Sequence, residues 1–550
     1  MFKIFIMRKA FLLLFFLNVA AMCLSQNATT IARPKLVVGI VIDQMRWDYL
    51  YRFYDLYKPD GGFKRFLNEG FSCENTFISY TPTYTAAGHS CVYTGTVPAI
   101  NGIVGNNWHD NILDRDFYCT DDATVKTVGS NSAAGIMSPR NMLSTTIGDE
   151  LRLATNFKSK VIGIAIKDRA SILPAGHDPT AAYWYDYSTG NFITSTYYMN
   201  ALPDWVNDFN KRKVVDSLYK LNWLLSLPRD VYSKYSTKDE EPFEFKTFGD
   251  DQAGFPYNLL KYVGNNYSAI TSTPHGNTLT EEMAEQAIVN ENLGKNNTTD
   301  MLTVSFSSPD YIGHAFGPNS WEEMDNYIRL DETLGRFFNF LDATVGKGDY
   351  TIFLTADHGV AHVPNFSIEN RLPGGAFNDI QLAQQINATL YAKYGVDKLV
   401  TGIYNFQLVV KNALIDSSKL PKEEIYNWII SYLQQQPEIA QAFKENSISS
   451  ATLPAKQKEM FTNGYYPSRC GDIAFILKPG YVEGNGIGTS HGLWNPYDSH
   501  IPLLWYGWGI KHGQTNRETY MTDIAATIAA MLHIQMPSGC IGKVIEEVSK

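Results

Sequence analysis

Three short apolar runs in this chain, each containing β-branched residues, lead into side chains that can bind metal ions. The runs cover residues 37–42, 302–306 and 350–354. With one residue near the C-terminal end, the side chains that follow them are three aspartates and three histidines: Asp43, Asp310, His314, Asp357, His358 and His491. Short strands that end in loops are typical of an α/β sheet, which presents ligand-binding residues at the carboxyl ends of its strands.

The residue types in this set indicate which metal it binds. Three Asp and three His, with no Cys, can form two sites of three ligands each. Catalytic Zn²⁺ uses three protein ligands and keeps a further position open for substrate. Two such ions about 4 Å apart can hold both the attacking and the leaving oxygen of a phosphoryl transfer. We therefore expect two Zn²⁺ ions per chain.

The N-terminus has the pattern of an export signal. A basic start, an apolar run over residues 11–19 and small residues after it predict that residues 1–25 are a signal peptide, cleaved before Gln26. A lipid anchor at Cys23 is a less favoured alternative, because Met22 fits poorly before a lipid-modified cysteine. The apolar run is too short to span a membrane, and no later segment is long enough. We expect an exported protein, periplasmic or secreted, with no membrane span.

Charge and cysteine content narrow the possible partners. The net charge of −10 argues against a nucleic-acid partner, because surfaces that bind nucleic acid are basic. Export permits disulfides, but the odd number of cysteines left after signal cleavage means that at least one thiol is unpaired. The pairing stays open among these five: Cys73, Cys91, Cys119, Cys470 and Cys540.

The pattern of apolar runs divides the mature chain into a core and two inserted segments. Strand-like runs alternate with helical periods over residues 34–180, 296–361 and 486–550, which we assign to a catalytic α/β core. Residues 181–295 and 362–485 break this alternation. We interpret both as insertions that cover or wall the site, and the second as a cap-like subdomain.

Individual elements follow from periodicity and capping. Ser320 with Glu323 three residues later predicts a helix start, and apolar residues recur at helical spacing from there to Leu341. The other expected helices are 379–394, 422–436 and 524–532, and the expected strands are 161–166, 405–410, 472–477 and 500–505.

Six motifs stand out along the chain: Asp43 in Val-Ile-Asp-Gln, residues 82–89 (Pro-Thr-Tyr-Thr-Ala-Ala-Gly-His), residues 102–106 (Gly-Ile-Val-Gly-Asn), the pair Asp310 and His314, residues 357–359 (Asp-His-Gly) and residues 490–492 (Ser-His-Gly). Together they resemble the motifs of the alkaline phosphatase superfamily, and more closely those of the exported, monomeric PafA-type alkaline phosphatases that use a threonine nucleophile. The resemblance covers nearly the whole mature chain. It implies an α/β sandwich with a mostly parallel central sheet, helices on both faces and inserted cap-like segments, in a monomeric two-zinc phosphomonoesterase.

The resemblance also assigns roles to the candidate site residues. It divides the ligands between two zinc ions, with Asp310, His314 and His491 on one and Asp43, Asp357 and His358 on the other. It makes Thr85, beside the second ion, both a zinc ligand and the nucleophile, while Thr83 is not nucleophilic. A threonine hydroxyl attacks poorly when protonated, and coordination to Zn²⁺ stabilises its alkoxide. His89 is expected in the core or behind the ligands rather than on a metal.

Two basic residues, Lys167 and Arg169, bear on which substrate the site accepts. By the same resemblance they bind the non-bridging phosphate oxygens, with Asn106 as a further amide donor. Two cations suit a dianionic monoester better than a monoanionic diester. The expected reaction is hydrolysis of small phosphate monoesters through a covalent phosphothreonine intermediate at Thr85.

Two other functions stay open at this point. A phosphodiesterase or nucleotide pyrophosphatase of the same superfamily would share the threonine and all six ligands, and the cations Lys167 and Arg169 argue against it. A zinc-containing binding protein without catalysis is the second alternative, and Thr85 argues against it. A sulfatase signature is absent at the nucleophile, and no third, magnesium-binding carboxylate set is evident.

Overall fold

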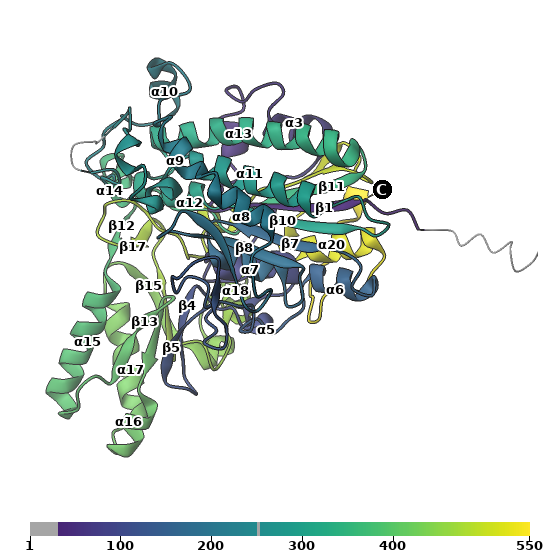
Figure 1. Ribbon diagram of the computed structural model, residues 1–550. Helices are drawn as coiled ribbons and strands as arrows, with labels where there is room; N and C mark the ends of the chain where they lie inside the picture. Colours follow the sequence, from purple (N-terminus) through teal and green to yellow (C-terminus); the bar gives the residue numbers. More distant parts are fainter. Residues whose placement is uncertain (1–30, 250–253, 550) are drawn as a thin grey trace, which may run out of the picture. The chain divides into compact units, whose positions relative to one another are not determined.

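A ten-stranded mixed sheet is the centre of the compact unit Pro34–Lys550 in the computed structural model, which describes residues 31–249 and 254–549 (Figure 1). The predicted signal peptide 1–25 and Cys23 lie outside the described residues. In spatial order the strands are β20 (Gly513–Thr515), β2 (Phe71–Cys73), β19 (Leu503–Gly507), β11 (Tyr350–Thr355), β1 (Leu36–Ile42), β10 (Asp300–Phe306), β7 (Val161–Ala165), β8 (Ala181–Asp186), β9 (Asn191–Ser195) and β6 (Thr127–Val128).

The middle of this sheet is parallel. Strand β1 pairs in parallel with β10 and β11, and β10, β7 and β8 continue the same direction. Antiparallel strands flank them, β19 on one side and β9 on the other. All seven residues of β1 are buried, as expected for a strand covered on both faces. The predicted α/β class with a mostly parallel central sheet is confirmed.

Helices cover both faces of the sheet (Figure 1). One group comprises α3 (Gly62–Glu69), α11 (His275–Asn290) and α13 (Trp321–Leu341), and the other comprises α4 (Thr85–Thr94), α6 (Ile147–Ala154), α7 (Asp168–Ala175) and α20 (Asp523–Leu532). The predicted start of α13 is confirmed, because Ser320 Oγ accepts a hydrogen bond of 3.1 Å from the backbone N–H of Glu323.

The central sheet extends into the segment 181–295. Strands β8 and β9 both belong to it, so the predicted boundary at residue 181 does not coincide with the edge of the sheet. The sequence of β8, Ala-Ala-Tyr-Trp-Tyr-Asp, shows no alternation between polar and apolar positions because all six of its residues are buried. A strand that is buried on both faces lacks the period that a half-exposed strand shows.

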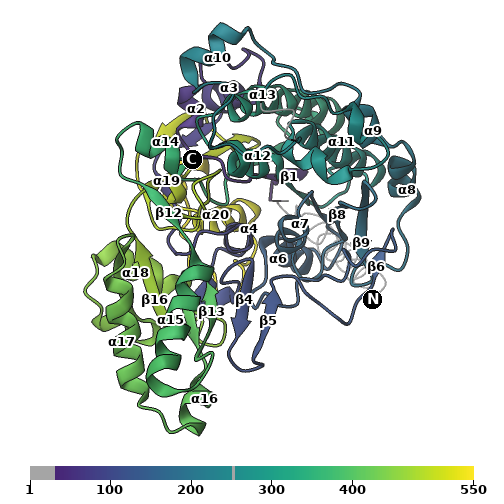
Figure 2. The same ribbon diagram turned by 90° about the vertical axis from the view of Figure 1, so that its left-hand side faces the viewer.

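The segment 362–485 forms a second sheet with its own hydrophobic cluster. Its four antiparallel strands are, in order, β13 (Val400–Tyr404), β14 (Gln407–Val410), β16 (Ile473–Leu477) and β15 (Ile439–Lys444). Figure 2 shows this sheet with the helices α15 (Asp379–Tyr394) and α17 (Lys422–Gln434). The predicted bounds of α15 are confirmed, and α17 ends two residues before the predicted 436. The cap-like role of this segment stays a prediction.

The strand predicted over residues 500–505 was wrong in its extent. Two strands occupy this region: β18 (His500–Ile501) pairs with β3 (Thr76–Phe77), and β19 belongs to the central sheet. Pro502 separates them, because proline has no N–H to donate to a strand ladder.

Two further expectations concern cysteines and membranes. All five cysteines of the described residues are free thiols, so none of the disulfides that export would permit is formed. Among residues 31–249 and 254–549, no helix combines the length and the apolar character needed to cross a bilayer.

Candidate active site

The predicted site residues gather at the carboxyl edge of the parallel strands. Asp43 directly follows β1, Lys167 follows β7 after one residue, and Asp357 follows β11 after one residue. Strand β10 leads into the helix α12 (Ser308–Phe316), which carries Asp310 and His314 one turn apart. Because these four strands are neighbours in the sheet, side chains from distant parts of the chain meet at one edge.

The ligand atoms form two overlapping groups. Atoms of Asp43, Asp357 and His358 lie within 4.8 Å of one another, and so do atoms of Asp310, His358 and His491. All five residues are buried. The first group is the predicted triplet. The position of His358 in both groups places the two sites next to each other.

His314 lies with the second group as predicted. Its Nε2 is 3.1 Å from Asp310 Oδ1, and the Nε2 of His491 is 3.7 Å from the same oxygen. The ring centroids of His314 and His491 are 5.1 Å apart. The structure therefore brings all six predicted ligands together.

Hydrogen bonds orient the three imidazoles toward the carboxylates. The Nδ1 atoms of His314, His358 and His491 lie 2.7, 3.0 and 2.7 Å from the backbone carbonyls of Thr489, Gly359 and Thr83, respectively. Such a bond holds the ring and leaves Nε2 as the free ligand atom.

Two carboxylate oxygens in the site accept no hydrogen bond from the described residues. They are Asp43 Oδ1 and Asp357 Oδ2, both buried. Imidazole nitrogens lie near each of them, His358 Nε2 at 3.6 Å from Asp43 Oδ1 and His89 Nδ1 at 3.2 Å from Asp357 Oδ2. An unpaired buried carboxylate oxygen costs free energy unless a cation compensates it. Together with three aimed imidazoles, these oxygens fit a pair of divalent ions such as Zn²⁺.

The ionisable groups of the site shift one another's pKa values. Burial, together with the nearby Asp310 and Asp357, raises the pKa of Asp43 well above its usual range. Burial also acts to raise the pKa of Asp310, but His314 and Lys167 outweigh it and hold the pKa well below the usual value. Burial lowers the pKa of His491, which favours the neutral imidazole that a metal requires.

Thr85 begins the helix α4 beside the first ligand group. Its Oγ1 lies 3.4 Å from His358 Nε2. The helix packs closely on the Asp357 loop, because a Cβ added at Gly88 would lie 2.5 Å from the Asp357 carbonyl oxygen. Only glycine permits this approach, which brings Thr85 to the ligands.

The two residues that we expected to be non-ligands have structural partners. Thr83 is buried and its hydroxyl donates to the Leu493 carbonyl at 3.1 Å. His89 is fully buried in α4, with Nδ1 at 2.9 Å from the Thr85 carbonyl and Nε2 at 2.8 Å from Ser305 Oγ. His89 thus lies behind the ligands.

Asn106 is fixed beside the start of α4. Its Oδ1 accepts a hydrogen bond of 3.0 Å from the N–H of Ala86, the residue after Thr85. Its Nδ2 donates to no described residue. The neighbouring Asn107 is exposed, and its carbonyl accepts from Asn405 at 2.9 Å. Asn106, rather than Asn107, therefore lies beside Thr85, and its role as an amide donor stays a prediction.

Lys167 and Arg169 lie at the start of α7 and differ in their partners. Lys167 Nζ donates to Asp43 Oδ2 at 2.7 Å and also to Asp310 Oδ2, so it joins carboxylates of both ligand groups. Arg169 Nη1 donates to the Tyr118 hydroxyl at 3.0 Å. The Lys167 ammonium thus lies between the two groups, and the expected binding of one phosphate by both side chains stays a prediction.

The charge of both side chains is secured by their neighbours. Burial acts to lower the pKa of Lys167, but Asp310 and Asp43 outweigh it and raise this pKa above its usual value. Burial acts in the same way on the pKa of Arg169, and Tyr118 and Asp168 outweigh it. Both groups are therefore cations in a buried site.

Gln44 is a site residue that the sequence reasoning missed. Its Nε2 donates to Asp310 Oδ1 at 2.8 Å, and its backbone N–H donates to Asp357 Oδ1 at 3.1 Å. It adopts a left-handed backbone conformation with φ of 67°, which turns the chain so that both donors face the ligands. Its place directly after Asp43 is the only local signal for this role.

An α/β sheet that presents two groups of Asp and His side chains beside a helix-terminal threonine is typical of metal-dependent hydrolases. Comparison with known proteins identifies the family to which the chain belongs. The model of the type I phosphodiesterase/nucleotide pyrophosphatase family matches residues 37–498, and the chain belongs to this family, within the alkaline phosphatase superfamily.

Two curated relatives match nearly the whole chain. Alkaline phosphatase PhoV of Synechococcus elongatus is 51% identical over 521 residues, which cover 95% of this chain and 94% of the relative. Alkaline phosphatase PafA of Elizabethkingia meningoseptica is 47% identical over 535 residues, which cover 97% of each.

The crystal structure of wild-type alkaline phosphatase PafA has the same fold. It matches with a TM-score of 0.93 at 47% identity, covering 95% of this chain and 100% of that chain. The predicted alkaline-phosphatase-like fold is confirmed.

Proposed function

We propose that this protein is an alkaline phosphatase that hydrolyses small phosphate monoesters through a phosphothreonine at Thr85. The observation that carries the proposal is the placement of Thr85 beside six converging ligands, with Asn106 fixed at the start of the same helix. The high identity to two alkaline phosphatases along the whole chain supports it.

The residues would hold two Zn²⁺ ions. Asp43, Asp357 and His358 would bind one ion together with Thr85, and Asp310, His314 and His491 would bind the other. When bound, these ions would favour the deprotonated Thr85 hydroxyl and neutralise the charge that develops on the leaving oxygen.

The chain's own residues perform two displacements at phosphorus. In the first, Thr85 Oγ loses its proton and forms a bond to phosphorus, while the bond to the ester oxygen breaks and the alcohol leaves with a proton. In the second, water forms a bond to phosphorus, the bond to Thr85 Oγ breaks, and inorganic phosphate leaves. Thr85 regains its proton.

Asn106 and Arg169 hold the phosphoryl group during both steps. Asn106 offers Nδ2 beside Thr85, and Arg169 offers a planar guanidinium that suits two phosphate oxygens. Lys167 places a second positive side-chain charge between the ligand groups. A monoester dianion gains more from these charges than a diester monoanion does.

The family name makes phosphodiester hydrolysis the second candidate function. Parallel assays of an aryl monoester and an aryl diester, each with and without chelator, separate the two. We expect faster, chelator-sensitive turnover of the monoester. A higher kcat/KM for the diester would favour the phosphodiesterase, and no turnover of either would favour a zinc-containing binding protein.

We also propose export as a monomer after removal of residues 1–25. Mass spectrometry of the released protein should show a chain that begins at Gln26. A lipid on Cys23 would instead indicate a membrane-anchored enzyme.

A further inference from the structure

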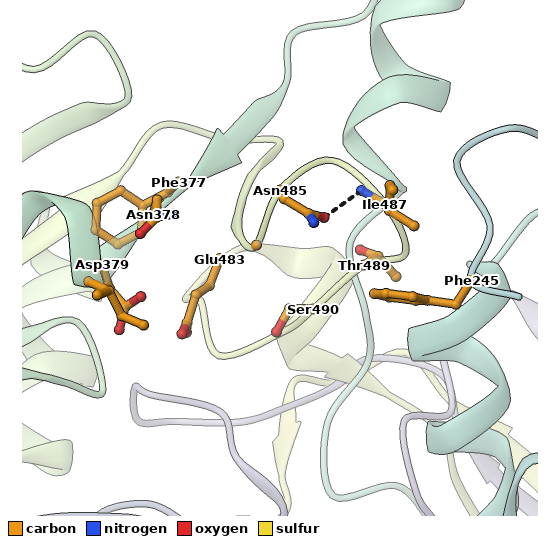
Figure 3. Close-up of a pocket in the computed structure, with 11 residues that line it drawn as sticks. Phe245, Phe377, Asn378, Asp379, Glu483, Asn485, Ile487, Thr489 and Ser490 are labelled. Atoms are coloured by element: carbon orange, nitrogen blue, oxygen red, sulfur yellow. Dashed lines mark hydrogen bonds between the residues drawn. The ribbon is translucent and has the colours of Figure 1, made fainter. Parts of the chain in front are cut away.

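A cavity of about 470 Å³ opens next to the chain segment that leads to His491. Figure 3 shows the residues that line it. Thr489 and Ser490 line it and directly precede His491. The Thr489 carbonyl is the partner of His314 Nδ1, at 2.7 Å. The cavity therefore borders the ligand group that, in the proposed function, faces the leaving oxygen rather than Thr85.

One wall of the cavity is apolar and is tied to the ligand helix. Phe245 and Ile487 line it with exposed fractions of 47% and 39%. The N–H of Phe245 donates at 2.9 Å to the carbonyl of Ala315 in α12, next to His314. Gly488 has φ of 64°, and a Cβ there would lie 2.4 Å from both the Phe245 ring and the His314 carbonyl. The Phe245 ring is thus held at a set position relative to His314.

The opposite wall is acidic. Figure 3 shows Asp379 and Glu483 across the cavity from Phe245. Asp379 is the first residue of α15, and Glu483 ends the strand β17 (Tyr481–Glu483). Within residues 31–249 and 254–549 neither forms an ion pair with a Lys, Arg or His. Burial and the nearby Asp379 raise the pKa of Glu483, as expected for two carboxylates that share a space.

The amide oxygens of Asn378 and Asn485, which line the cavity, are engaged by backbone N–H groups. Asn378 Oδ1 caps α15 by accepting from the N–H of Gln381 at 2.8 Å. Asn485 Oδ1 accepts from the N–H of Ile487 at 3.1 Å. The Nδ2 groups of both amides remain as neutral donors. Among the described residues, the only charged ones that line the cavity are Asp379 and Glu483, and Phe245 adds an exposed aromatic face.

We propose that this cavity binds the leaving group of the substrate and selects phosphate monoesters of amino alcohols. The ammonium group would lie between Asp379 and Glu483, while the carbon stem packs on Phe245, whose ring face also attracts a cation. A leaving group with a second phosphate or a carboxylate would be repelled. The inference rests on the proposed function and names the substrate class of that site.

The test compares two substrates that differ in charge and little in shape. Phosphocholine carries a quaternary ammonium, and 3,3-dimethylbutyl phosphate is its uncharged isostere. We expect kcat/KM to be about tenfold higher for phosphocholine, since one or two partly exposed ionic contacts and a cation–π contact contribute differences of this order. Replacing both carboxylates, Asp379→Asn with Glu483→Gln, should bring the ratio close to one.

Two further variants separate charge from packing. Phe245→Ala should lower kcat/KM for both esters, because it removes the surface on which either stem packs. Asp204→Asn is the control: like Asp379, Asp204 is the first residue of a helix, α8 (Asp204–Lys211), but it is exposed and does not line the cavity. It should leave the ratio at the wild-type value. Melting temperatures verify that each variant is folded.

The outcomes distinguish this inference from the proposed function. Turnover of p-nitrophenyl phosphate with a ratio near one in the wild type would overturn the cavity assignment and leave the phosphatase intact. So would a high ratio that the double variant retains. Failure of the wild-type, zinc-loaded enzyme to hydrolyse any of the three esters would overturn both.

Discussion

Two regions of this molecule bury carboxyl groups, and the side chains that surround these groups differ between the regions. At the carboxyl edge of the central sheet, Asp43 lies among other carboxylates, imidazoles and an ammonium group. In the segment 362–485, Glu445 is equally buried, but its side chain has one hydrogen bond, from Gln407 Nε2 at 3.1 Å. Its other oxygen has no partner among the described residues.

The difference shows that burial alone does not make a metal site. Burial raises the pKa of Glu445 to about 8, so this group remains neutral over most of the physiological range. At the sheet edge, several carboxylates converge with three imidazoles whose Nδ1 atoms are already engaged. Convergence of aimed donors from neighbouring strands distinguishes the site from an isolated buried acid.

Metal removal should have the largest effect. Dialysis against a chelator should abolish hydrolysis of an aryl monoester and lower the melting temperature, because it removes the cations that would balance the buried carboxylates of Asp43 and Asp357. Added Zn²⁺ should restore both. Full activity in protein shown to be metal-free by elemental analysis would contradict the two-zinc site.

Thr85→Ala should remove the phosphoenzyme and most of the turnover. Thr85→Ser should keep part of both, since the oxygen remains while the restriction on χ1 is relaxed. Phosphoenzyme trapped by acid quench and located by mass spectrometry provides the measurement.

Thr83→Ala is the matched control for this pair. It removes one buried hydrogen bond, which costs about 1 kcal/mol of stability, and should leave the phosphoenzyme in place. Normal covalent phosphate in Thr85→Ala would move the nucleophile elsewhere, first to Thr83.

The pair Lys167→Ala and Arg169→Ala should change selectivity as well as rate. Each lost charge-assisted contact should lower kcat/KM for the monoester about 10- to 100-fold, and the diester should lose much less. Asn106→Ala should cost less, since it removes a neutral donor. Lys160→Ala, at the opposite end of β7, is the control and should leave the ratio unchanged. Equal losses for both esters in the double variant would favour a purely structural role.

Gln44→Ala should weaken metal binding. It removes the Nε2 donor that orients Asp310, and loss of such an outer partner typically lowers metal affinity about 10- to 100-fold. Competition with a chromophoric chelator measures this without an activity assay. Gln407→Ala is the control, because this buried glutamine donates a hydrogen bond to Glu445 rather than to a ligand of the site. It should leave the Zn²⁺ affinity at the wild-type value.

Glu445→Gln should give the smallest effect, on stability rather than activity. The folded-state pKa of Glu445, about 8, lies above its ordinary value of 4.5, so its stabilising contribution is present below pH 4.5 and lost as the pH rises through 8. At pH 9 the variant should therefore melt about 1–3 °C above the wild type. Glu459→Gln, on an exposed face of α18 (Ala455–Gly464), should show no such gain. A pH-independent difference would mean that Glu445 does not titrate in the folded protein.

Much of the architecture was readable from local patterns. The apolar runs before Asp43, Asp310 and Asp357 became the neighbouring strands β1, β10 and β11. The capping signal at Ser320 and the period over residues 379–394 placed two helices correctly. These features depend on the spacing of apolar residues and on local capping signals, which a short stretch of sequence contains by itself.

Contacts between distant parts of the chain were decided only by the tertiary structure. The sequence by itself determined which side chains follow which strands, and with them the six candidate ligands. It could not determine that Lys167 joins Asp43 to Asp310, that Gln44 donates to two ligands, or that Asp379 and Glu483 share one cavity. These depend on strand order and on how helices end against the sheet, and such long-range geometry has no period in the sequence.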